Sequence, residues 1–210
     1  MTIRKTSARV VGALFVMATA AGVVSAVLLG PGDQASAPAS AAALMVLIMA
    51  VAIAMIPPVL FPILKEHNEA LALGYVVART LEVVLVLPAT VGPLMSLSGA
   101  PDDIVRIVTG TYDVWGHPGS MVFFCLGAAI LNVLLFRSGL VPRWISGWAL
   151  IGVLPYLADA GLVMFGALAP FSAIHSVLVI PLALNEMVLA GWLLTRGFAV
   201  TTAGAGYKRR

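Results

Sequence analysis

The sequence predicts an all-α integral membrane bundle of six transmembrane helices, and three observations lead to this prediction. Hydrophobic residues make up 61% of the 210 residues and charged residues only 10%, with a mean hydropathy of +1.06, whereas about 25% of residues in soluble domains are charged. The apolar residues fall into blocks of about 20, the length that a helix needs to cross a hydrocarbon core. Lys and Arg lie mostly on one side of these blocks. We therefore expect the lipid bilayer to be the main partner of the chain.

The first predicted span runs from Val10 to Leu29 and follows a basic segment at residues 1–9. A signal peptide is the alternative, because the small residues around Ser36 resemble a cleavage region. A block of about 20 apolar residues is long for a signal-peptide core, so we favour a transmembrane helix. Small residues spaced by four share one stripe of this helix, which favours close helix packing or reflects an alanine-rich composition: Ala18, Gly22 and Ala26.

The second predicted span, residues 41–64, contains three prolines in its last third. Proline removes a backbone donor and kinks a helix, so we expect a bend that faces the bundle interior. The third span begins near Asn68, which is suited to cap the helix, and Glu69 favours the helix start through the dipole. This span extends to residue 97, longer than a straight crossing requires, so it must tilt or break near Pro88.

The remaining spans follow the longest connection, residues 98–119. Residues 104–108 within it are suited to a short amphipathic helix on the membrane surface. The fourth span covers residues 120–136, the fifth 144–168 and the sixth 171–194.

We divide the chain into three parts. Residues 1–9 form a basic N-terminus, residues 10–197 a single six-helix transmembrane domain, and residues 198–210 a basic tail. Ten of the twelve Lys and Arg residues fall on one side of the predicted membrane: Arg4, Lys5, Arg9, Lys65, Arg137, Arg143, Arg196, Lys208, Arg209 and Arg210. Arg106 falls on the other side and Arg79 within the membrane. Because basic residues mark the cytoplasmic side, we expect both termini in the cytoplasm.

Four formally charged residues lie within the predicted spans: Arg79, Glu82, Asp159 and Glu186. A charged side chain at the bilayer centre costs about 2.5–3.5 kcal/mol on insertion scales, so we expect these four to face one another or a wet cavity. Arg79 and Glu186 both lie about 15 Å from the inner surface at about 1.5 Å per residue. The matching depth predicts an ion pair between them.

Two tyrosines complete the candidate intramembrane polar site. Tyr75 lies one turn before Arg79 on the same helix face, and Tyr156 reaches the level of Glu82, with Asp159 one turn further out.

Three carboxylates share one arginine, so at least one acid lacks a full counter-charge, and burial favours its protonated form. Such an acid serves as a general acid or a proton relay, or is inert when a neighbouring tyrosine or asparagine hydrogen-bonds it.

We expect no metal, no cofactor and no nucleic-acid partner. His175 lies within reach of His117 and Asp159, but their spacing matches no familiar metal signature. Cys125 is the single cysteine and lies in an apolar run, so no disulfide forms within the chain. The basic residues separate apolar blocks and do not form a nucleic-acid motif.

Four segments carry a family resemblance: RKTSARVVGALF, LFPILKEHNEALALGYVVARTLE, RSGLVPRWISGWALIG, and PLALNEMVLAGWLL followed by Gly197 and Phe198. They resemble the bacterial family of multi-pass membrane proteins called domain of unknown function 4386. The resemblance implies a multi-pass protein of the bacterial plasma (inner) membrane, and it implies no activity.

Three functions and one purely structural interpretation remain open. The first is a non-enzymatic membrane protein that binds or senses a small lipophilic molecule. The second is an intramembrane enzyme that uses Glu82, Asp159 or Glu186 as an acid on a lipophilic, isoprenoid-like substrate. The third is a small transporter or channel, which needs a homo-oligomer to form a path. A structural polar core is the remaining interpretation.

Overall fold

The structure is a computed structural model, and it describes residues 3–29, 39–170 and 172–199. Within these ranges the chain forms helices and no strands. Six helical segments are long and apolar enough to cross a membrane. The all-α membrane bundle that the sequence predicts is confirmed.

The principal helices agree closely with the predicted spans. They are α1 (Ile3–Leu29), α2 (Ala39–Leu64), α3 (Glu69–Val86), α6 (His117–Ser138), α7 (Arg143–Met164) and α8 (Ala173–Thr195). Two shorter helices, α4 (Val91–Leu97) and α5 (Asp102–Thr111), extend α3 and α6. Because α1 begins at Ile3, the basic side chains before Val10 belong to its first turns.

Both ends of α3 follow from local side-chain chemistry. The side chain of Asn68 accepts a hydrogen bond of 2.9 Å from the Leu71 amide, so the predicted N-cap is confirmed. After Val86 the chain tightens into the 3₁₀ segment η1 (Leu87–Thr90) before α4 begins. Pro88 lacks an amide donor and interrupts the ladder of α-helical hydrogen bonds. The α-helix expected to break near Pro88 changes to 3₁₀ there, and the helical span continues to Leu97.

The connection between α4 and α6 is more helical than the sequence predicts. α5 has no buried side chain, as a surface helix would, but it continues through the π-helical segment η2 (Tyr112–Gly116) into α6. The result is one unbroken helical stretch, Asp102–Ser138. Pro118 comes shortly after the π-helical segment, near the start of α6, and the helix continues through this proline without ending.

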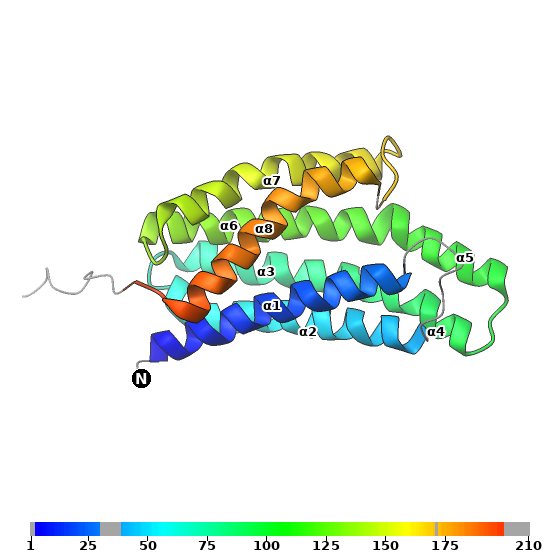
Figure 1. Cartoon of the computed structure of the whole chain (residues 1–210), viewed down its shortest axis with the longest axis horizontal. Coiled ribbons are helices and arrows are strands. Elements are labelled where there is room, and N and C mark those ends of the chain that lie inside the picture. Colours follow the sequence, from blue (N-terminus) through cyan, green and yellow to red (C-terminus); the bar gives the residue numbers. More distant parts are fainter. Residues whose placement is uncertain (1–2, 30–38, 171, 200–210) are drawn as a thin grey trace, which may run out of the picture.

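The six principal helices form a closed ring. α1 contacts α2, α2 contacts α3, α3 contacts α6, α6 contacts α7, α7 contacts α8, and α8 returns to α1 (Figure 1). A Cβ at Gly12 would lie 2.8 Å from Leu194 Cγ and 2.9 Å from the Ala190 carbonyl oxygen. A glycine at this position therefore lets α1 approach α8 closely enough to close the ring.

The start of α1 and the end of α8 lie at the same end of the bundle (Figure 1), which we call the termini end. Side chains from all six helices pack into one core in this half, including Phe15, Tyr75 and Ile145. The opposite end, which carries α4 and α5, is the far end. The termini half of the bundle is thus tightly packed, and the space described below lies in the far half.

Candidate functional site

A cavity of about 320 Å³ occupies the far half of the ring, and all six principal helices contribute to its lining. α1 and α2 provide a wall of apolar and small side chains: Ala18, Gly22, Ala26, Val46, Met49 and Ile53. The opposite wall is polar and comes from α3, α7 and α8: Arg79, Glu82, Tyr156 and Glu186. Four of the six residues of the predicted polar site therefore line one cavity.

Arg79 and Glu82 form a buried ion pair on α3. Arg79 Nη1 lies 2.9 Å from Glu82 Oε2, and only 4% and 5% of the two side chains are exposed. The contact is not aligned as a hydrogen bond. The sequence predicted Glu186 as the partner of Arg79; within the described residues no ion pair joins these two, although both line the cavity. Residues three apart face the same side of a helix, so Glu82 reaches Arg79 without help from another helix.

Packing holds the Arg79 side chain in place. Its guanidinium carbon lies 5.4 Å from the centre of the Phe124 ring on α6, an arrangement in which the ring face attracts the cation. The Phe124 ring in turn lies 5.0 Å from the Tyr156 ring. A Cβ at Gly127 would come within 2.9 Å of Arg79 Cδ, so the glycine leaves the room that the Arg79 stem occupies.

A second, smaller cavity adjoins the termini half. Its volume is about 10 Å³, and its lining includes Tyr75, Arg79, Asn132 and Glu186. Tyr75 Oη and Asn132 Oδ1 are buried and make no hydrogen bond within the described residues. A space of this size has room for about one water molecule. Tyr75, the fifth residue of the predicted site, thus joins Arg79 and Glu186 here.

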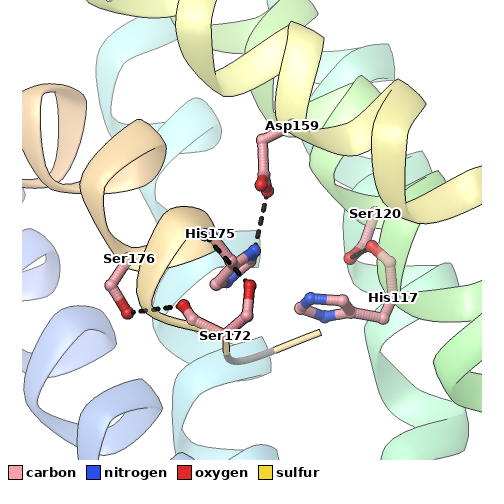
Figure 2. A network of polar contacts seen from close by, with 6 residues as sticks. All are labelled: His117, Ser120, Asp159, Ser172, His175 and Ser176. Atoms are coloured by element: carbon pink, nitrogen blue, oxygen red, sulfur yellow. Dashed lines mark hydrogen bonds and ion pairs between the residues drawn. The ribbon is translucent and has the colours of Figure 1, made fainter. Parts of the chain in front are cut away.

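Asp159, the sixth predicted residue, lies apart from Arg79 and Glu186. Its carboxylate is fully buried and contacts His175 Nδ1 at 2.7 Å, as Figure 2 shows. The His175 ring centre lies 5.8 Å from that of His117, and His117 lines the large cavity. The expected proximity of His175 to both residues is confirmed, and Asp159 is not part of the lining of either cavity.

Hydrogen bonds within α6 and at the start of α8 position the residues around this pair. The Ser172 hydroxyl accepts a hydrogen bond of 3.2 Å from the His175 amide and thereby caps α8 (Figure 2). Ser120 donates a hydrogen bond of 2.7 Å to the His117 carbonyl oxygen. Among the described residues, no group of three or more His, Cys, Asp or Glu side chains is placed to hold a metal ion.

Several residues of the cavity carry no sequence signal for a site. Phe124 and Tyr112 lie in stretches where aromatic residues are ordinary membrane-helix composition, so only the structure identifies them as lining. The stripe of Ala18, Gly22 and Ala26 did stand out by its spacing. Its small side chains leave space for the cavity, in addition to the close packing that Gly22 makes with Met49 on α2.

A polar head and an apolar body can both be accommodated in this arrangement. The acids and the guanidinium provide ionic and hydrogen-bonding groups, and the α1–α2 wall provides apolar contact.

A family model described as Domain of unknown function (DUF4386) matches residues 8–197, which include most of α1 and all of the other spans. No curated protein matches the chain, and no solved structure matches it.

Proposed function

The chain belongs to the family described as Domain of unknown function (DUF4386), and on that premise we propose that it binds a small lipophilic molecule inside the bundle. One observation carries the proposal: a cavity of about 320 Å³ with a mostly apolar wall on α1 and α2 and a more polar wall on α3, α6, α7 and α8. Sites for small molecules commonly measure about 300–1,000 Å³ and combine an apolar lining with a few polar groups.

The arrangement of α1 and α8 supports entry from the bilayer. The two helices touch at Gly12 near the termini end and diverge toward the far end (Figure 1). Val23 on α1 lines the cavity and is 58% exposed, so the cavity extends to the surface of the bundle beside α1. In a membrane this surface faces lipid. A lipophilic ligand would thus enter sideways between α1 and α8.

The packed termini half favours binding over passage through the protein. The core that includes Phe15, Tyr75 and Ile145 lies between the large cavity and the termini end. A ligand that enters the far half meets this core and stops at the level of Arg79 and Glu186. Retention of a ligand at one depth suits a binding or sensing protein.

The distribution of charge supports an orientation with both termini in the cytoplasm of a bacterial cell. Lys65, Arg143 and Arg196 flank the membrane-spanning segments at the termini end, whereas Arg106 lies on α5 at the far end. Basic residues next to spans favour the cytoplasmic side. The cavity then opens in the outer leaflet of the plasma membrane.

A second candidate function, acid catalysis on a lipophilic substrate, rests on the two cavity carboxylates. Glu82 and Glu186 line the same cavity as Tyr156, so an acid can reach a bound molecule. Glu82→Gln and Glu186→Gln keep the size of each side chain and remove its acid. If either variant still binds a molecule that the wild-type protein converts, and no longer converts it, the enzyme is favoured over the binder.

Mass spectrometry of the full chain, extracted gently from its native membranes, tests the proposed function. We expect a non-covalently bound small lipophilic molecule that is released when the protein is unfolded. An unrelated six-helix protein extracted in the same way controls for lipid that clings to any membrane surface. If both proteins release the same molecules in the same ratio, the proposal is wrong.

A further inference from the structure

The charges on the cavity wall do not balance. Arg79, Glu82 and Glu186 are the side chains with formal charge among its described lining. The ion pair at 2.9 Å joins Arg79 to Glu82, and the Phe124 ring lies 5.4 Å from the guanidinium carbon. Glu186 forms no ion pair within the described part of the chain. The cavity lining therefore has two carboxyl groups for one arginine, and its other basic side chain is the His117 imidazole.

Aromatic rings surround the same space. Phe15, Tyr112, Phe124 and Tyr156 line the cavity together with Glu186. Aromatic faces attract cations, and a carboxylate beside such faces forms a site for an ammonium group. Arg79 already lies over Phe124, so Tyr156, which is next to Phe124, is the ring best placed to meet a second cation.

The second observation is that two buried polar atoms near Glu186 make no hydrogen bond with other described residues. Tyr75 Oη and Asn132 Oδ1, both almost fully buried, make no hydrogen bond in the described part of the chain. They line the small cavity that also includes Glu186. A hydrogen-bond donor brought to Glu186 would thus find acceptors beyond the carboxylate, directly or through one water molecule.

We propose that the ligand is a lipophilic amine, whose ammonium group binds Glu186 beside the Tyr156 ring while its apolar body lies against α1 and α2. This inference rests on the proposed function, because it names the chemical class of the molecule that the cavity holds. The bound ammonium would form an ion pair with Glu186, and Arg79 would stay paired with Glu82.

Three probes with the same chain and different heads test the inference: octylamine, octanol and octanoate. Each is added to the purified full chain in detergent, and its dissociation constant follows from the rise in melting temperature with probe concentration. We expect octylamine to bind about tenfold more tightly than octanol. The wild-type comparison requires no variant, so it stands even if a substitution at Glu186 prevents folding.

Two variants locate the effect. Glu186→Gln should remove the preference for octylamine over octanol, whereas Glu69→Gln, at the exposed start of α3, should keep that preference. Equal binding of octylamine and octanol, or tightest binding of octanoate, would overturn the inference while the binding function stands. Failure of all three probes to bind would contradict both proposals.

Discussion

The Arg79 guanidinium and the Glu82 carboxylate, one turn apart on α3, form an ion pair of 2.9 Å in the interior of the bundle. Because both groups belong to one helix, the cation can be neutralised whether or not α8 approaches. A buried charge is expensive unless it is paired. The pair therefore makes it possible for an arginine to lie in the middle of a membrane protein, and it leaves the Glu186 carboxyl available to the cavity.

The first prediction concerns this pair. Arg79→Gln and Glu82→Gln each leave one buried partner alone, so each should lower the free energy of unfolding by about 3–5 kcal/mol. The double variant should recover most of that loss, because neither member of the pair is then left without its partner. Thermal unfolding in detergent measures the effect, with Thr80→Ala on the exposed face of α3 as a control. A second double-mutant cycle combines Arg79→Gln with Glu186→Gln. If its coupling energy is larger than that of the cycle with Glu82→Gln, the assignment of the ion pair to Glu82 is wrong.

The second prediction concerns the closure of the ring at Gly12. Gly12→Ala places a Cβ 2.9 Å from the Ala190 carbonyl oxygen and 2.8 Å from Leu194 Cγ, so α1 and α8 must separate. Overpacking of this kind costs about 1–3 kcal/mol of unfolding free energy. Gly191→Ala on α8 is the matched control, since nothing lies within 4 Å of its Cβ. Equal stability of the two variants would argue against close packing of α1 on α8.

The third prediction concerns the room for Arg79. Gly127→Ala brings a methyl group within 2.9 Å of Arg79 Cδ, and the paired guanidinium head prevents an easy retreat. We expect a loss of about 1–3 kcal/mol in unfolding free energy. The loss should shrink in the Arg79→Gln/Glu82→Gln background, where the shorter glutamine leaves space. Gly161→Ala, with open space around it, serves as the control, and an unchanged loss in the double background would contradict this explanation.

The fourth prediction concerns Asp159 and His175, which join α7 to α8 at 2.7 Å (Figure 2). Asp159→Ala should lower the unfolding free energy by about 1–3 kcal/mol, because it removes a fully buried contact between the two helices. A double-mutant cycle with His175→Ala should give a coupling of about 0.5–3 kcal/mol. Asp113→Ala, at a partly exposed position, controls for loss of a carboxylate. Strict additivity in the cycle would show that the contact contributes nothing.

The fold is largely predictable from the sequence because local chemistry decides it. Apolar blocks of about 20 residues predict the spans, Asn68 predicts the start of α3, and Pro88 predicts its end. The continuous helix through η2 was not predictable in this way. A proline that ends a helix and a proline that a helix passes through look alike in sequence, and Pro118 is of the second kind.

The candidate site is predictable in its members but not in its contacts. Depth along a helix follows from residue counting, which places Arg79 and Glu186 at one level, and both side chains line the small cavity. Which helices adjoin is decided by the ring: α3 contacts α2 and α6, and α8 adjoins α1 and α7. Nothing in the sequence gives that order. The predicted partner of Arg79, Glu186, is wrong because Glu82 lies three residues further along α3 and contacts the guanidinium within one helix.

The presence of a ligand in the cavity is tested most directly by filling the cavity. Ala183 on α8 lines the cavity, whereas Ala158 on α7 is exposed on the bundle surface, so Ala183→Phe and Ala158→Phe add the same ring inside and outside. Mass spectrometry then measures the small molecule that each variant carries out of native membranes. We expect wild-type protein and Ala158→Phe to carry equal amounts, and Ala183→Phe about tenfold less. If Ala183→Phe folds and carries as much as the wild type, the cavity is not the binding site.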